Sequence, residues 1–249
     1  MEARRGDFSP LALARAGGAL YLVIIVLGLF AEMFVRNQII VPGDAAATVM
    51  RMTYAEPIWR YGIVAELLAA FCTTGLAMIY FVLLNPVSRP LNLLATFFRM
   101  VGVAVQVSAV LFLVVALFPL GSSAVFTALA PEVRNALVSL AIRAHSHGFS
   151  VALMFTGCTF LVHGYLIRKS LFLPRVLGVL IQIAGVCYLA NGFAVIVAPA
   201  IVGRLFPVLF GPVIVAELSL SLWLLVKGVN VETWLAANRG TYLSAHEKA

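Results

Sequence analysis

The sequence has few charged residues, few cysteines and none of the short motifs that identify common enzyme classes. Charged residues make up 11% of the 249, against about 25% in a soluble globular domain, which excludes an ordinary soluble fold. The three cysteines all lie in apolar stretches, so neither a disulfide framework nor a paired-cysteine metal site is expected. The sequence also has no Gly-rich phosphate loop and no nucleophile elbow, which removes the familiar signatures of nucleotide-binding and hydrolytic enzymes.

Apolar residues fill most of the chain instead, at 63% of the sequence and a mean hydropathy of +1.05. About 20 apolar residues suffice for a helix to cross a membrane, and backbone groups in lipid must pair within their own segment. We therefore expect an all-α bundle of six transmembrane helices, forming one membrane domain over residues 1–230 with a short polar cytoplasmic tail over 231–249. The predicted spans are residues 17–35, 61–84, 91–118, 147–167, 176–200 and 205–227.

The basic residues predict the orientation, because Lys and Arg concentrate on the cytoplasmic side of membrane proteins. Six spans place both termini on one side, which holds ten basic residues against six on the other; with Arg99 inside the membrane these account for all 17. Both termini are therefore predicted to be cytoplasmic, with the protein in the plasma or inner membrane. The ten are Arg4, Arg5, Arg15, Arg89, Arg168, Lys169, Arg175, Lys227, Arg239 and Lys248, and the six are Arg36, Arg51, Arg60, Arg134, Arg143 and Arg204.

Two segments on the opposite side are predicted to form structure of their own. Pro42 and Gly43 form a turn signal, and Asp44 is a good N-cap, so a short interfacial helix is expected to follow it. Residues 131–146 also have a helical pattern and begin with a proline. Joined to the fourth span, they would form a helix about 55 Å long. We therefore expect a bend near residues 145–148.

Ionisable residues inside the spans mark the candidate site. A charge in hydrocarbon costs roughly 2.5–3.5 kcal/mol on insertion scales and is functional by default. Arg99 and Glu217 both lie near the middle of the bilayer, which predicts that they form a pair, either as a structural clasp between helices or as part of a site. The candidate catalytic residues are Glu66, Glu217, Arg99 and His145.

A second group of polar residues lies at the end of the membrane away from the termini. Glu66 is five residues inside the second span, and Arg and His residues are predicted at a similar depth. Glu32 and Arg36 lie one turn from the membrane surface and are interpreted as a solvated or snorkelling pair. The candidate substrate-binding residues are Glu32, Arg60, Arg143 and His147.

The histidines do not predict a metal or a haem. His145 and His147 could supply two ligands, but a zinc site needs three or four, and His163 lies about 27 Å further along the same helix. Paired axial haem ligands usually come from different helices, whereas every intramembrane histidine is on the fourth span. No cofactor and no metal are expected, and His163 is expected to bond to a neighbouring helix.

Several short stretches stand out: Arg15-Ala16-Gly17, Ile40-Val41-Pro42-Gly43-Asp44-Ala45-Ala46, Arg60-Tyr61-Gly62-Ile63-Val64-Ala65-Glu66, Phe98-Arg99, His145-Ser146-His147-Gly148, Leu173-Pro174-Arg175 and Glu217-Leu218. Together they resemble a bacterial membrane-protein family known as a domain of unknown function, DUF 4386. The resemblance covers roughly residues 12–230, and that family often has Asp at the position of Glu66, which implies that an acid is what matters there. It implies membrane class and no particular chemistry.

Three functions remain open on the sequence. The first is binding of a lipid or small amphiphile in a polar-lined intramembrane pocket, without turnover; no nucleic-acid partner is expected. The second is an intramembrane enzyme acting on a lipid or isoprenoid, with Glu66 or Glu217 as proton donor. By architecture alone, the chain is similar in this respect to the small membrane-bound terpene cyclases. The third is a proton-coupled transporter, which the midplane charges favour and the lack of an inverted repeat disfavours.

Overall fold

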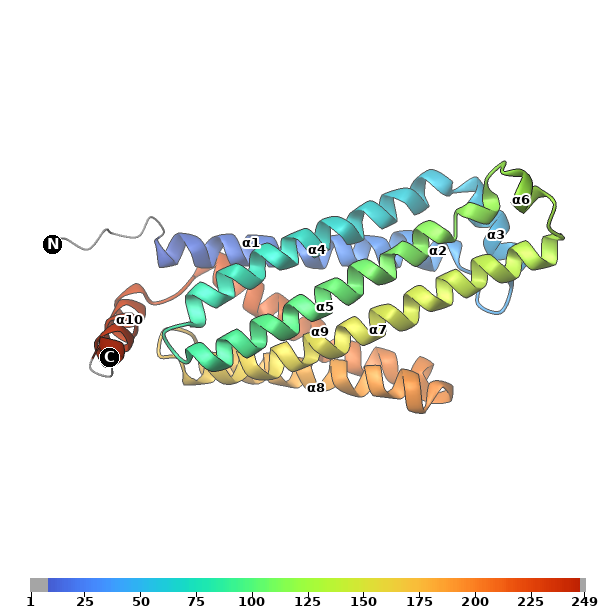
Figure 1. Cartoon of the computed structure of the whole chain (residues 1–249). Helices are drawn as coiled ribbons and strands as arrows, with labels where there is room; N and C mark the ends of the chain where they lie inside the picture. Colours follow the sequence, from blue (N-terminus) through green and yellow to red (C-terminus); the bar gives the residue numbers. More distant parts are fainter. Residues whose placement is uncertain (1–8, 247–249) are drawn as a thin grey trace. The chain divides into compact units, whose positions relative to one another are not determined.

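The computed structural model describes residues 9–246, without the side chains of residues 206, 207 and 240–246. Every regular element in this part of the chain is helical, which confirms the all-α prediction (Figure 1). The helices are α1 (Pro10–Leu29), the π-helix η1 (Phe30–Arg36), α2 (Asn37–Ile39), α3 (Ala45–Tyr54), α4 (Glu56–Leu84), α5 (Arg89–Val115), the 3₁₀ helix η2 (Phe118–Leu120), α6 (Ala124–Thr127), α7 (Pro131–Lys169), α8 (Arg175–Val197), α9 (Pro199–Val226) and α10 (Val231–His246).

Six of these helical segments are long and apolar enough to cross a membrane, so the protein is a multi-pass membrane protein. Their number matches the prediction, and most of them extend beyond the predicted ends because polar end residues continue the helices outside the apolar runs. The segments are Pro10–Ile39, Glu56–Leu84, Arg89–Leu120, Pro131–Lys169, Arg175–Val197 and Val208–Val226.

The fourth segment differs most from the prediction. Instead of bending near residues 145–148, α7 continues as one uninterrupted helix of 39 residues. Gly148 does not break it, because this glycine is used for close packing: a Cβ there would meet the Cβ of Ala109 on α5 at 2.8 Å. At 1.5 Å per residue α7 is about 58 Å long, nearly twice the hydrocarbon thickness, so part of it extends into the aqueous phase.

The predicted interfacial helix is present as α3. Gly43 has a positive φ of 80°, which glycine adopts without strain, and completes the turn before the helix. The Asp44 side chain then accepts a hydrogen bond from the Ala47 amide at 2.8 Å, as an N-cap residue should.

Internal contacts divide the chain into two compact units, each assembled from separate segments. The first comprises Met1–Leu22, Thr74–Met100 and Met154–Ala249, and the second comprises Val23–Thr73 and Val101–Leu153. The division does not test the prediction of one membrane domain over residues 1–230, which stays a prediction.

The second unit is held together by a continuous apolar core. Trp59 is its largest member and is 1% exposed, and its indole N–H donates to the Leu113 carbonyl at 3.1 Å. This bond satisfies the one polar atom of the side chain inside the core. Val35 and Ile39 of the first span and Val138 and Ile142 of α7 pack into the same cluster.

Close backbone approach at glycines shapes the first unit. A Cβ on Gly18 would lie 2.4 Å from the Leu225 amide nitrogen and 2.6 Å from the Ser221 carbonyl oxygen, so α1 approaches α9 more closely than a side chain allows. Gly157 and Gly185 bring α7 and α8 together in the same way. Small residues at contacts are typical of helix packing in membranes, where the hydrophobic effect does not drive helices together and close van der Waals packing matters more.

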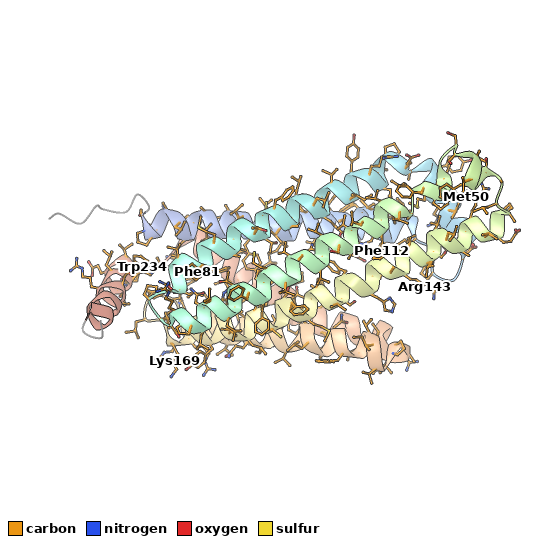
Figure 2. The ribbon with its side chains drawn as sticks, in the orientation of Figure 1. Met50, Phe81, Phe112, Arg143, Lys169 and Trp234 are labelled. Carbon is orange, nitrogen blue, oxygen red and sulfur yellow. The ribbon has the colours of Figure 1, made fainter. Side chains whose placement is uncertain are left out.

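The segment predicted as a polar tail forms α10, and its residues after 246 lie outside the described part. Figure 2 labels Trp234 on this helix; its indole N–H donates to the Leu83 carbonyl on α4 at 2.9 Å. Helix α10 is therefore anchored to the first unit rather than fully solvated.

Candidate functional sites

The second unit contains a buried polar cluster of Glu32, Arg36, Glu66 and His145, here called the Arg36 cluster. Arg36 forms ion pairs with both acids, with Glu66 and, at 2.7 Å, with Glu32. His145 Nε2 lies 3.1 Å from the other oxygen of Glu66. The side chains of Arg36, Glu66 and His145 are at most 10% exposed, whereas that of Glu32 is 47% exposed. Access to the cluster is therefore on the Glu32 side.

Local backbone features bring this cluster together. Glu32 and Arg36 both lie on the π-helix η1, in which the Asn37 amide donates to the Glu32 carbonyl five residues earlier. Such wide turns occur often at functional sites. On α4, Gly62 lies against Val35, where a Cβ would come within 2.8 Å of the valine side chain. One turn later on α4 is Glu66, so this close approach brings its carboxylate to Arg36.

The hydrogen bond to Glu66 fixes the role of the His145 ring. A carboxylate paired with a guanidinium only accepts hydrogen bonds, so Nε2 of His145 is the donor and Nδ1 of the neutral ring is an acceptor. That Nδ1 atom is buried and has no partner among the described residues. The cluster therefore presents an oriented imidazole with one nitrogen free to accept a proton or a hydrogen bond.

Three of the four predicted substrate-binding residues lie outside this cluster. Arg60 is exposed and pairs with Glu56 one turn earlier, at 2.6 Å. Arg143, labelled in Figure 2, is also exposed. His147 is exposed and donates through Nδ1 to the Arg143 carbonyl at 2.9 Å. All three side chains are exposed, whereas Glu66 is buried, a difference that depth along the sequence does not encode.

Arg36 itself corrects the sequence interpretation. The prediction placed it with Glu32 as a solvated or snorkelling pair, but Arg36 is 9% exposed and is the centre of the cluster. Its burial is stabilised because two acids neutralise the guanidinium, Glu32 from the same helical segment and Glu66 from α4. Glu32 fits the prediction better, since it is the exposed member.

The first unit contains a second polar cluster around Arg99. The predicted Arg99–Glu217 ion pair is not formed: no nitrogen–oxygen contact within 4.0 Å joins these two described side chains. Instead Arg99 donates to Thr156 at 3.2 Å and lies over the Phe160 ring, 5.3 Å from its centroid. Glu217 accepts a hydrogen bond from the Tyr188 hydroxyl at 2.7 Å. The contacts recorded for Arg99 and Glu217 are thus with neutral groups, although the two side chains still interact electrostatically over a longer distance.

Buried polar atoms without partners surround Arg99. Among the described residues, the hydroxyls of Tyr21 and Tyr80 and the Nε2 atom of His163 make no hydrogen bond. All three residues are 4% exposed, and the His163 and Tyr80 rings are 5.0 Å apart. Arg99 interacts electrostatically with each of them. The expected bond from His163 to a neighbouring helix is not seen at Nε2. We call this group, with Tyr188 and Glu217, the Arg99 cluster.

Neither cluster has the composition of a metal site. Among the residues described, no three His, Cys, Asp or Glu side chains come together in a way that could hold an ion. His145 and His147 have separate surroundings, the first buried against Glu66 and the second exposed. The chemistry available in both clusters is therefore that of acids, a guanidinium, imidazoles and phenols.

The fold and both clusters define the class: a six-span helical membrane protein with polar groups buried at two places. Residues 16–228 match a family described as a domain of unknown function, DUF4386, and the chain belongs to this family, which confirms the resemblance. Comparisons with curated proteins and with solved structures gave no match. Family membership carries no activity, so function has to be argued from the two clusters.

Proposed function

We propose that the protein binds a lipid or another small amphiphile in an intramembrane pocket at the Arg99 cluster. One observation carries the proposal: among the described residues, three buried polar atoms, on Tyr21, Tyr80 and His163, have no hydrogen-bond partner, and the neighbouring Arg99 has no carboxylate within ion-pair distance. Each unpaired buried polar group costs about 1–3 kcal/mol. Three such costs in one place are explained if a ligand supplies the missing hydrogen bonds.

The chemistry of the cluster favours a head group with oxygen atoms. Arg99 has no carboxylate within ion-pair distance, so its charge is available to an anionic or strongly polar group. The hydroxyls of Tyr21 and Tyr80 can donate to such a head group, and His163 Nε2 can donate or accept. Glu217 has one oxygen bonded to Tyr188 and can accept a hydroxyl with the other. The apolar helices around these groups would hold the tail.

The experiment is mass spectrometry of the small molecules that co-purify with the full chain in mild detergent. We expect a specific amphiphile with the wild type that is reduced at least tenfold with Arg99→Gln and with the double variant Tyr21→Phe/Tyr80→Phe. Tyr61→Phe is the matched control, because Tyr61 is on the same helix as Tyr80 but is 65% exposed. Equal amounts of the same bulk lipids in all four preparations would refute a ligand pocket at this cluster.

A second candidate function, an intramembrane enzyme, rests on the Arg36 cluster. Glu66 orients the His145 ring through Nε2, and the free Nδ1 could take a proton from a substrate while Glu66 stabilises the resulting imidazolium. A carboxylate and an imidazole in this relation recur in general-base catalysis.

This candidate makes a separate prediction for turnover. Membranes containing the wild type would convert a lipid or isoprenoid substrate, and His145→Gln would abolish conversion while the purified variant still melts cooperatively. His147→Gln is the control, because that ring is exposed and two residues away. If lipid extracts from cells expressing wild type and His145→Gln are identical, the enzyme reading fails and the binding proposal is unaffected.

For location, we propose the plasma or inner membrane with both termini in the cytoplasm, supported by the ten basic residues on that side against six on the other. A fluorescent protein fused after residue 249 should fluoresce, and alkaline phosphatase fused there should be inactive. The reverse pattern would refute this orientation.

A further inference from the structure

The end of α7 and the start of α8 form a basic pocket that neither cluster explains. It has a volume of about 360 Å³ and is lined by Tyr165, Arg168, Lys169 and Arg175, all in the first unit. Figure 2 shows Lys169 at the carboxyl end of α7. Among the described residues, no carboxylate lies within ion-pair distance of these three cations. We propose that this pocket binds the phosphate of an anionic phospholipid.

The position of Arg168 is built into the helix pair. Gly164 and Gly178 bring α7 and α8 into backbone contact, and a Cβ on Gly178 would lie 2.6 Å from Arg168 Cγ. The arginine stem therefore lies across the space left by the glycine. Its guanidinium donates to the Gln182 side-chain oxygen at 2.9 Å, which leaves its other N–H groups free. The Lys169 ammonium lies over the Tyr165 ring, 5.8 Å from its centroid.

Arg175 is the observation that points to an anion. Arg168 and Lys169 are expected at the carboxyl end of a helix, where the helix dipole favours cations. Arg175, in contrast, is the first residue of α8, where the dipole disfavours a positive charge, and no side chain caps this end. An anion in the pocket would neutralise Arg175 and also receive the free backbone N–H groups of α8.

The surroundings favour a lipid over a free anion. Leu171 is 75% exposed, Val176 is 60% exposed and Val179 is 41% exposed, so an apolar surface adjoins the cations. A phospholipid would place its phosphate in the pocket and its acyl chains along this surface. Basic pockets between helices at the membrane surface are known binding sites for anionic head groups.

The test is native mass spectrometry of the full chain in detergent, titrated with dioleoylphosphatidylglycerol or dioleoylphosphatidylcholine. We expect tighter binding of the anionic lipid, reduced about fivefold by Lys169→Gln and about 25-fold by Arg168→Gln/Lys169→Gln, since each basic residue contributes roughly 1 kcal/mol. Lys227→Gln, which removes an exposed lysine at the end of α9, should bind like the wild type. Arg168→Lys keeps the positive charge and should therefore retain part of the affinity for the anionic lipid. This result separates loss of charge from loss of folding.

Two results would overturn the proposal. Equal affinities for the anionic lipid in the wild type and in Lys169→Gln would show that the cations only stabilise α7. Displacement of the lipid by millimolar inorganic phosphate at constant ionic strength, with the same dependence on Arg168 and Lys169, would assign the pocket to a free anion. Neither result bears on the Arg99 cluster, so this inference and the proposed function fail independently.

Discussion

The Tyr80 hydroxyl allows a sharp test of the proposed pocket. Its removal should stabilise the protein when the pocket is empty and destabilise it when a ligand is bound. Tyr80 is 4% exposed and its hydroxyl has no partner among the described residues. In the empty protein, Tyr80→Phe removes an unsatisfied polar atom without leaving a cavity, so it should stabilise the fold by about 1–3 kcal/mol. In the loaded protein the same change removes one hydrogen bond to the ligand and should cost about 1 kcal/mol.

The assay is thermal unfolding followed by tryptophan fluorescence, on protein as purified and on protein stripped of bound amphiphile by exhaustive detergent exchange. For a chain of this size, 1 kcal/mol corresponds to a shift in melting temperature of about 2–4 °C. Tyr80→Phe should therefore melt several degrees above the wild type when stripped, and below it when loaded.

Tyr188→Phe is the matched control. Its hydroxyl donates to Glu217 at 2.7 Å, so its removal leaves a partly buried acid without this donor and should destabilise both preparations. If Tyr80→Phe destabilised the stripped protein as much as Tyr188→Phe does, the Tyr80 hydroxyl would have a partner in the empty protein. The argument from unpaired atoms would then fail.

Three further changes test other parts of the structure by thermal unfolding in detergent. Glu66→Gln should destabilise by about 2–4 kcal/mol, because it leaves buried Arg36 with only the half-exposed Glu32; rescue by the double variant Glu66→Gln/Arg36→Gln would show that the unpaired charge is the cause, and no change on Glu66→Gln would contradict the pairing. Gly18→Ala should cost about 1–3 kcal/mol, since its Cβ would overlap the α9 backbone, and unchanged melting would exclude that close approach. Trp59→Phe should cost a similar amount through the lost bond to the Leu113 carbonyl and the unfilled volume, and a neutral result would place the indole outside the core.

The helices were predictable from the sequence because long apolar runs identify the segments that cross the bilayer. Within lipid, the backbone groups of such a segment must pair with each other, which a helix achieves. The buried face of α4 was also predictable: Gly62, Glu66, Thr73, Ala77 and Tyr80 recur at helical spacing, and all five are buried. The bend in α7 was wrongly predicted, because a helix of about 55 Å was assumed to be too long to continue straight out of the bilayer, whereas α7 is one uninterrupted helix.

The candidate sites could be predicted only in part. Charges such as Glu66 and Arg99 stand out in apolar runs, so sequence analysis found them. Tyr188 does not stand out, because a tyrosine is ordinary in a membrane helix until a partner such as Glu217 is known. Arg36 was interpreted as part of a solvated or snorkelling pair, because its depth could be read from the sequence but the π-helical turn that carries it could not. Partner choice depends on helix rotation and neighbours, and neither is encoded locally.

The two clusters solve the problem of buried charge differently, and this difference indicates which one is suited to a ligand. In the Arg36 cluster the guanidinium is already shared between two carboxylates, Glu32 and Glu66, so a further anion would compete with acids already in place. Among the described residues, Arg99 directly contacts the Thr156 hydroxyl and the Phe160 ring, and the hydroxyls of Tyr21 and Tyr80 near it lack partners. A partly buried cation such as Arg99, held by neutral groups, loses part of its hydration without full compensation, and binding an oxyanion or hydroxyl would recover part of that loss. The Arg99 cluster therefore gains more from a polar head group, whereas the Arg36 cluster, already neutralised, is better suited to orienting His145.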